Sequence, residues 1–186
     1  NLTGLEFLAG IPGTVGGALH MNAGAFDGWL WNHVESAEIM TRYGEVKQFG
    51  FNEFKTAYRK VEMPEKGWFT KAKLRLDAGD INVAKEKVED ILARRRGKQP
   101  LQWPSCGSVF RNPAGDHAGR LIEAVGMKGL QIGDAQVSEM HSNFIINLGQ
   151  AKSADVEALI EEVQQQVKEK FGVWLEPEVC IVGEKE

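Results

Sequence analysis

The stretch GIPGTVGGALHMNAGAF, from Gly10 to Phe26, contains five glycines and no Asp, Glu, Lys or Arg. Glycine tolerates positive φ angles and lets a ligand approach the backbone closely. Successive amide groups in a tight loop can also form a nest for an anion. The stretch has neither the G-x-G-x-x-G pattern nor the Gly-Lys-Ser/Thr ending of a P-loop. Two interpretations are therefore open: a cradle for a phosphate-bearing cofactor, or tight turns packed against a sheet.

Composition restricts the class of protein. The 186 residues suit one large domain or two small ones, and 42% hydrophobic with 26% charged residues is typical of a globular protein. A net charge of −4 argues against nucleic acid or an anionic membrane surface as partner. No apolar run approaches the roughly 20 residues that span a bilayer. Two cysteines fit a reducing compartment, so we expect a cytoplasmic protein, and a monomer.

The first part of the chain predicts an antiparallel sheet. Alternating apolar residues over 34–41 predict a half-buried strand, and a turn at Gly44 lets VKQFGF return beside it. A further strand is predicted over 71–76. A helix should then follow Asp80 and end at Gly97.

The second part predicts two more helices and two strands. Asp116 should open a helix that ends at Gly126, and Ser153 should cap a long helix that ends at Gly172. NFIINLG is typical of a buried strand, and a final strand is predicted over 178–182. The chain is thus expected to be α+β, with a domain boundary near Gly79 that separates residues 1–79 from 80–186.

Several polar side chains are candidates for chemistry. Arg59 in AYRK suits a carboxylate or phosphate, or is simply solvated. Gly107 before Ser108 predicts a sharp turn that presents the hydroxyl, although the surrounding sequence is not the G-x-S-x-G of hydrolases. Glu176 and Glu178 flank a proline, as a cleft pair or a surface pair. The four histidines have no ligand spacing, so no metal site is expected.

Taken together, five stretches point to one family. GIPGTVGGALHMNAGAF, AYRK, PSCGSVFRNP, AGRLIEAVGMKGLQIGDAQVSEMHSNFIINLG and VWLEPEV occur in family-like order and spacing. They resemble the UDP-N-acetylenolpyruvoylglucosamine reductases, the MurB-type enzymes of bacterial peptidoglycan synthesis and hence of cell-wall biogenesis and cell division. The resemblance covers essentially the whole chain, and the form without an inserted loop, called type II, matches best.

The resemblance implies a fold and cofactors. Residues 1–79 would be the second subdomain of a vanillyl-alcohol-oxidase-type FAD-binding domain, and 80–186 a MurB-type substrate-binding αβ domain. The family's upstream glycine-serine-asparagine loop is not in this sequence, so an N-terminally truncated member is expected. The implied reaction uses NADPH and FAD to reduce UDP-N-acetylglucosamine enolpyruvate to UDP-N-acetylmuramate.

The resemblance also implies residue roles. Arg59 would stabilise negative charge on the substrate carboxylate, Glu178 would lie beside that carboxylate, and Ser108 would donate the proton. The implied substrate-binding residues are Tyr58, Lys98, Asn112 and His141, with Lys98 also assisting the serine through water. The implied cofactor-binding residues are Gly10, Ile11, Pro12, Gly13, Thr14, Gly16, Gly17, Asn22, Gly24 and Ala25.

Two other functions are kept as alternatives. One is a non-catalytic fragment that binds the UDP-sugar but not FAD, because the upstream loop is not in the sequence. The other is a different FAD oxidase on the same fold. Cys180 also stands where some relatives carry an arginine, which leaves one implied substrate contact in doubt.

Overall fold

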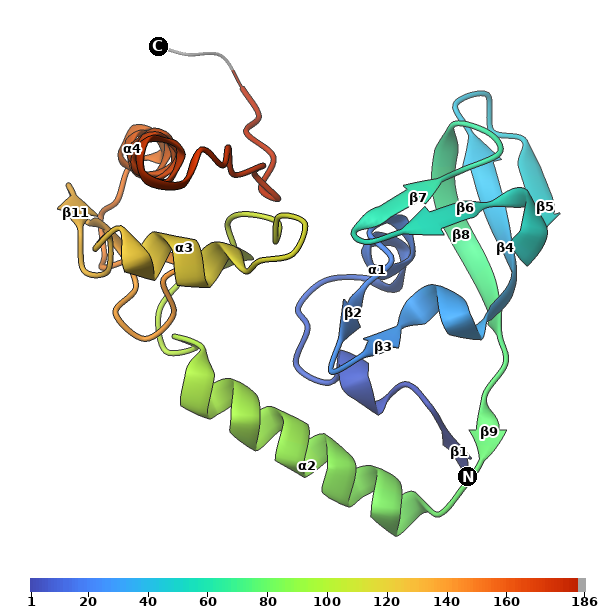
Figure 1. Cartoon of the computed structure of the whole chain (residues 1–186). Helices are drawn as coiled ribbons and strands as arrows, with labels where there is room; N and C mark the ends of the chain where they lie inside the picture. The colour runs from blue at the N-terminus through green and yellow to red at the C-terminus, as the bar shows by residue number, and fades with distance from the viewer. Residues whose placement is uncertain (184–186) are drawn as a thin grey trace. The chain divides into compact units, whose positions relative to one another are not determined.

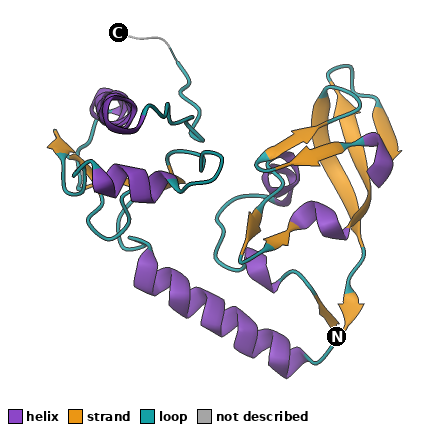
Figure 2. Ribbon diagram, viewed as in Figure 1, coloured by secondary structure: helices purple, strands orange, loops and turns teal. Residues whose placement is uncertain are grey.

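The computed structural model describes residues 1–183. By its contacts the chain divides into two compact units, Asn1–Arg95 (unit 1) and the part that begins at Arg96 (unit 2). Each unit contains both helices and strands (Figure 2), which confirms the predicted α+β class. Within the described residues, no helix has the length and apolar character needed to cross a membrane.

Unit 1 is built on a three-stranded antiparallel sheet in the order β5-β4-β8 (Figure 1). The strands are β4 (Val34–Thr41), β5 (Val46–Gly50) and β8 (Gly67–Leu74). All three predicted strands are therefore confirmed, although β8 begins four residues before the predicted range. Buried residues recur along one face of β4, and Ile39 on that face is fully buried.

The glycine-rich stretch forms a loop, a short helix and a tight hairpin beside this sheet. Helix α1 (Val15–His20) follows Thr14, whose hydroxyl accepts a hydrogen bond from the Gly17 amide at 3.1 Å. Strand β2 (Gly24–Ala25) pairs with β3 (Gly28–Trp29). The smaller paired strands of unit 1 are β1 (Leu2–Thr3) with β9 (Asp77–Ala78), and β6 (Lys55–Ala57) with β7 (Lys60–Glu62).

Helix α2 (Ile81–Lys98) follows Asp80, whose carboxylate accepts a hydrogen bond from the Asn82 amide. It passes through Gly97, where we predicted its end, and stops before Pro100, because a residue that precedes proline is disfavoured in the helical region. An ion pair of 3.8 Å joins Lys87 to Glu6. By contacts, the first compact unit extends to Arg95 and so includes most of α2; the domain boundary near Gly79 stays a prediction.

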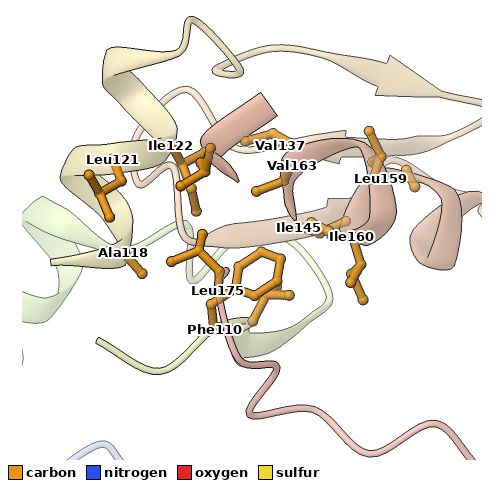
Figure 3. Close-up of a cluster of buried hydrophobic side chains, with 13 residues drawn as sticks. Phe110, Ala118, Leu121, Ile122, Val137, Ile145, Leu159, Ile160, Val163 and Leu175 are labelled. Atoms are coloured by element: carbon orange, nitrogen blue, oxygen red, sulfur yellow. The ribbon is translucent and has the colours of Figure 1, made fainter. Parts of the chain in front are cut away.

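Unit 2 contains a four-stranded antiparallel sheet in the order β10-β13-β12-β11. Its strands are β10 (Ser105–Ser108), β11 (Gln131–Ile132), β12 (Ala135–Val137) and β13 (Phe144–Asn147), and its helices are α3 (Ala118–Ala124) and α4 (Ser153–Phe171). Side chains from both helices and from the sheet form one buried cluster, in which Ile122, Val137 and Val163 are at most 1% exposed (Figure 3).

Two predicted details of unit 2 differ in the structure. Ser153 is the first residue of α4 and not its cap; the Asp155 carboxylate accepts the Lys152 amide at 2.9 Å instead. Residues 178–182 form no strand, contrary to the prediction; an isolated bridge between Pro177 and Phe110 lies just before them. Gly172 ends α4 as predicted, with a φ of 70°.

Candidate functional site

A cleft of about 430 Å³ opens on unit 2 and contains three of the predicted site residues, Ser108, Asn112 and His141. Its walls come from the end of β10, the segment that leads into α3, α3 itself and the turn before β13. The described residues that line it also include His117, Arg120, Lys128 and Asn143, which the sequence analysis did not select. The cleft is therefore rich in hydrogen-bonding and basic groups.

Ser108 is the last residue of β10 and lies opposite Phe144 of β13. The preceding Gly107 has a φ of +80°, and the strand register shifts between Ser105 and Ser108. The sequence predicted a sharp turn before the serine; the structure has instead an irregularity within β10 at this point. Because an L-residue at such a φ is strained, Gly107 makes this presentation of Ser108 possible.

Asn112 connects the cleft to the start of α3. Its side-chain oxygen accepts a hydrogen bond from the Ala118 amide at 3.1 Å. The oxygen is therefore already used in a hydrogen bond within the protein, whereas the amide nitrogen Nδ2 donates to no other described residue. The Asn112 side chain is exposed at the cleft, so Nδ2 is available there as a donor.

Two basic side chains on the cleft are held by carboxylates. Arg120 donates from Nε to Oδ1 of Asp116 at 2.7 Å, and a second contact joins its Nη2 to Oδ2. This pairing, helped by the His117 amide, lowers the pKa of Asp116 to about 2. Lys128 donates to Glu123 at 2.8 Å. Both cations are thus partly oriented before any anion arrives.

His141 lies half-buried in the cleft. Burial lowers the pKa of its imidazole, and the nearby Lys128 charge acts in the same direction. Its Nδ1 accepts a hydrogen bond from the Asn143 amide at 3.3 Å. A neutral ring that accepts at Nδ1 carries its proton on Nε2, so His141 offers one donor at neutral pH.

Glu178 lies on the segment that pairs with the chain just after Ser108. The Glu178 amide donates to the Val109 carbonyl at 2.7 Å, and the Arg111 amide donates to the Glu176 carbonyl at 2.9 Å. Arg111 also forms a 3.2 Å ion pair with Glu176. Ser108 and Glu178 are therefore on neighbouring segments of unit 2, but Glu178 is not among the residues that line the cleft.

In unit 1, Arg59 occupies a strained backbone position next to the glycine-rich stretch. Its φ is +52°, and its Nη2 donates to the carbonyl oxygen of Gly24 at 3.1 Å. Its guanidinium lies 5.1 Å from the centre of the Tyr58 ring and 6.0 Å from that of Trp29. Left-handed backbone in a non-glycine residue is found preferentially at functional sites.

The glycine-rich stretch divides into a packed part and an exposed part. Asn22 is buried, and both polar atoms of its side chain bond within the protein: Nδ2 to the Ala57 carbonyl and Oδ1 to the Trp31 amide. A Cβ on Gly24 would lie 2.6 Å from the Trp29 ring. Asn22 and Gly24 are thus explained by packing, as in the second interpretation of the sequence.

The exposed part is the loop before and into α1. Pro12, Gly13, Thr14 and Gly17 are exposed, and nothing lies within 4 Å of the Cβ position of Gly13, where φ is +127°. An open backbone without side chains can lie against a flat or phosphate-bearing cofactor. These residues therefore fit the expected FAD, whereas Asn22 and Gly24 do not add to that fit.

The remaining predicted residues lie outside the cleft. Lys98 is exposed at the end of α2, and Tyr58 is 41% exposed in unit 1. Cys106 is exposed, and the partial burial of its thiol raises the pKa, which disfavours the thiolate. Across residues 1–183, no group of three His, Cys, Asp or Glu side chains is arranged to hold a metal ion.

Comparisons with known proteins agree with the resemblance in the sequence. Residues 99–182 match the family model described as the C-terminal domain of UDP-N-acetylenolpyruvoylglucosamine reductase. Curated proteins named UDP-N-acetylenolpyruvoylglucosamine reductase match nearly the whole chain. The protein from Alkalilimnicola ehrlichii is 55% identical over 98% of this chain and 61% of its own length, and that from Methylococcus capsulatus is 54% identical over 97% and 60%.

A solved structure is also similar. The UDP-N-acetylenolpyruvylglucosamine reductase from Thermus caldophilus superposes with a TM-score of 0.83 at 38% identity, over 95% of this chain and 63% of that one. The chain thus spans about three fifths of the length of the curated relatives it matches.

Proposed function

We propose that this chain is a member of the UDP-N-acetylenolpyruvoylglucosamine reductase family, to which its matches are similar. It would bind UDP-N-acetylglucosamine enolpyruvate through the cleft of unit 2 and take part in the reduction of this substrate to UDP-N-acetylmuramate. The observation that carries the proposal is the cleft itself. It gathers Asn112 and His141, which the family resemblance assigns to substrate binding, and Ser108, which it assigns as proton donor, on one surface with two cations.

The electrostatics of the cleft support an anionic ligand. A sugar nucleotide carries its charge on a diphosphate, and the enolpyruvyl group adds a carboxylate. The Arg120 guanidinium and the Lys128 ammonium face the cleft, and Asn112 and His141 add uncharged donors. Arginine suits phosphate and carboxylate oxygens because its donors form a planar fork.

The proposed chemistry adds a hydride and a proton across the enol ether. FAD, when bound, supplies the hydride that it receives from NADPH. The exposed backbone of Pro12, Gly13, Thr14 and Gly17 would hold that cofactor. This chain's residues supply the rest, and they begin with charge stabilisation: Arg59 would stabilise the negative charge that builds on the substrate carboxylate. Glu178 is the other residue that the family resemblance assigns to that carboxylate.

Ser108 would complete the addition. Its hydroxyl proton passes to the carbon next to the carboxylate, and the oxygen must then recover a proton. A serine hydroxyl is a weak acid, so it needs a proton source such as Lys98 acting through water. Tyr58, Asn112 and His141 would bind the substrate.

The test separates the two half-reactions. With FAD present, NADPH should bleach the flavin absorbance, and UDP-N-acetylglucosamine enolpyruvate should restore it. Ser108→Ala should leave the bleaching unchanged and slow the restoration by a factor of roughly 10² or more. Ser153→Ala is the control, because Ser153 is exposed at the start of α4 and does not line the cleft. Equal losses in both half-reactions would contradict the role of Ser108.

A binding role without catalysis is the second candidate, because every residue of the cleft belongs to unit 2. A colourless protein that still binds the sugar nucleotide would support this candidate. A yellow protein whose reduced flavin is not reoxidised by the substrate would instead support a different flavin oxidase. We further propose a cytoplasmic monomer, for which a single monomeric mass of 20.6 kDa is expected in solution.

A further inference from the structure

We infer that Asn143 is a positioning residue, whose side chain holds the main chain after Ser108 so that Ser108 and Asn112 present their polar groups to the cleft. The identity of the ligand in this inference rests on the proposed function. The hydrogen bonds by which Asn143 holds the main chain, called the clamp below, are independent of it.

The clamp is formed by both ends of one amide. Oδ1 of Asn143 accepts the Phe110 amide at 3.0 Å, and Nδ2 donates to the Phe110 carbonyl at 2.8 Å. The main-chain oxygen of Asn143 also accepts the Val109 amide at 2.8 Å. Asn143, Val109 and Phe110 are 5%, 1% and 2% exposed, so water does not replace these bonds.

The position of the clamp in the chain explains its effect on the cleft. Ser108 comes one residue before Val109, and Asn112 comes two residues after Phe110. Fixing residues 109 and 110 therefore fixes both cleft residues. The strand pairing of β10 ends at Ser108, so the side chain of Asn143 takes over where the regular ladder stops.

Asn143 also contacts the other wall of the cleft. Its amide donates to Nδ1 of His141 at 3.3 Å, which holds the imidazole with its proton on Nε2. One residue thus connects the Ser108 segment to the His141 ring. Its side chain and its main-chain oxygen act on the first of these, and its main-chain N–H acts on the second.

Removal of the side chain should loosen the segment. Alanine at this position would leave the Phe110 N–H and C=O buried without partners, which is costly. The segment would then rearrange, and Ser108 and Asn112 would leave their positions. Affinity for the ligand should fall because fewer groups are in place before binding.

The control is Asn147, four residues further on and the last residue of β13. Its Oδ1 accepts the Gly149 amide at 2.8 Å and the Ala151 amide at 3.1 Å, and it does not line the cleft. Asn143→Ala and Asn147→Ala therefore each remove two bonds from a side-chain amide to the main chain. Only the first should affect the cleft.

The experiment is calorimetric titration of the full chain with UDP-N-acetylglucosamine enolpyruvate, at a temperature where circular dichroism shows each variant folded. We expect Asn143→Ala to raise the Kd roughly tenfold and Asn147→Ala to leave it within about twofold. A Kd for Asn143→Ala equal to that of Asn147→Ala would overturn the inference. If the alanine variant does not fold, Asn143→Leu, which keeps the volume, takes its place with the same expectation.

Amide hydrogen exchange keeps this inference separate from the proposed function. The Phe110 amide should exchange at least tenfold faster in Asn143→Ala than in Asn147→Ala, with or without ligand. If the unmodified chain binds no sugar nucleotide, the proposed function fails and the exchange rate alone decides on the clamp. An unchanged rate at Phe110 would overturn the inference.

Discussion

The main-chain N–H of Glu178 donates to the carbonyl oxygen of Val109 at 2.7 Å. This bond joins the segment that follows Ser108, the proposed proton donor, to the segment of Glu178, which is proposed to contact the substrate carboxylate. Both segments belong to unit 2. Pro177, which lies between Glu176 and Glu178, is opposite Phe110 at a position where no N–H is needed. Proline is tolerated there because it has no donor to lose.

Proline should therefore be neutral at 177 and disruptive at 178. Pro177→Ala should change the free energy of unfolding by less than ~1 kcal/mol. Glu178→Pro should lower it by about 1 to 3 kcal/mol, because the bond to Val109 is lost. Glu178→Ala, which keeps the N–H, separates the main-chain loss from that of the side chain. Urea unfolding measures all three, and an equal cost for Glu178→Ala and Glu178→Pro would contradict the pairing.

Asn22 is expected to act on stability and not directly on a cofactor. Asn22→Ala removes the bonds to Ala57 and Trp31, at a position where φ is +43°. The free energy of unfolding should fall by about 1 to 3 kcal/mol. Asn22→Gly loses the same bonds but tolerates the positive φ. Its free energy of unfolding should therefore lie between that of Asn22→Ala and that of the wild type. Weaker FAD binding at unchanged stability would show that the side chain contacts the cofactor after all.

His141 should make the chain less stable in mild acid. The fold lowers the pKa of this imidazole below its ordinary 6.5, so the folded state favours the neutral ring. Its contribution to stability is present above about pH 6.5 and is lost as the pH falls, because the unfolded chain then binds the extra proton. Thermal unfolding of the wild type and His141→Gln at pH 8 and 5.5 tests this. The variant should lose less stability on acidification; an equal loss would contradict the neutral ring.

Asp116 should affect the stability of the fold at a lower pH than His141 does. Its pairing with Arg120 lowers its pKa from 3.8 to about 2. That contribution is present above about pH 4 and is lost between pH 4 and 2. Asp116→Asn should therefore lower stability at pH 7 and converge with the wild type near pH 2. Asp90→Asn, which breaks the exposed pair with Arg94 on α2, is the control with the same spacing. A gap between Asp116→Asn and wild type that persists unchanged at pH 2 would contradict the pairing.

The sequence predicted well those parts that depend on local pattern. Alternation predicted β4 and its partners, and Gly172 predicted the end of α4. The prediction that α2 ends at Gly97 was wrong, because one glycine weakens a helix without ending it, whereas Pro100 ends it. The strand predicted over 178–182 was wrong: the paired part of this segment is 176–178, beside residues 109–111, and residues 179–182 form no strand.

The candidate site was predicted in part, for a related reason. Ser108, Asn112 and His141 followed from the family resemblance, with a local signal only at Ser108, and the structure places them on one cleft. Arg120, Lys128 and Asn143 were missed because a basic residue in a helix or a buried asparagine carries no local mark of function. The role of Asn22 also depends on Ala57, which lies 35 residues away in the sequence. A pattern of neighbouring residues cannot predict such a contact.

Binding of the sugar nucleotide in the cleft of unit 2 is what the proposed function requires first. Its most direct test is a titration of the isotope-labelled chain with UDP-N-acetylglucosamine enolpyruvate, followed by amide and side-chain NMR signals. We predict that the largest shifts occur at Ser108, Asn112 and His141, with Tyr43 and Trp174 unaffected as exposed aromatic controls outside the cleft. Saturating ligand that leaves the three cleft residues unshifted, or shifts only residues away from them, would contradict the proposed function.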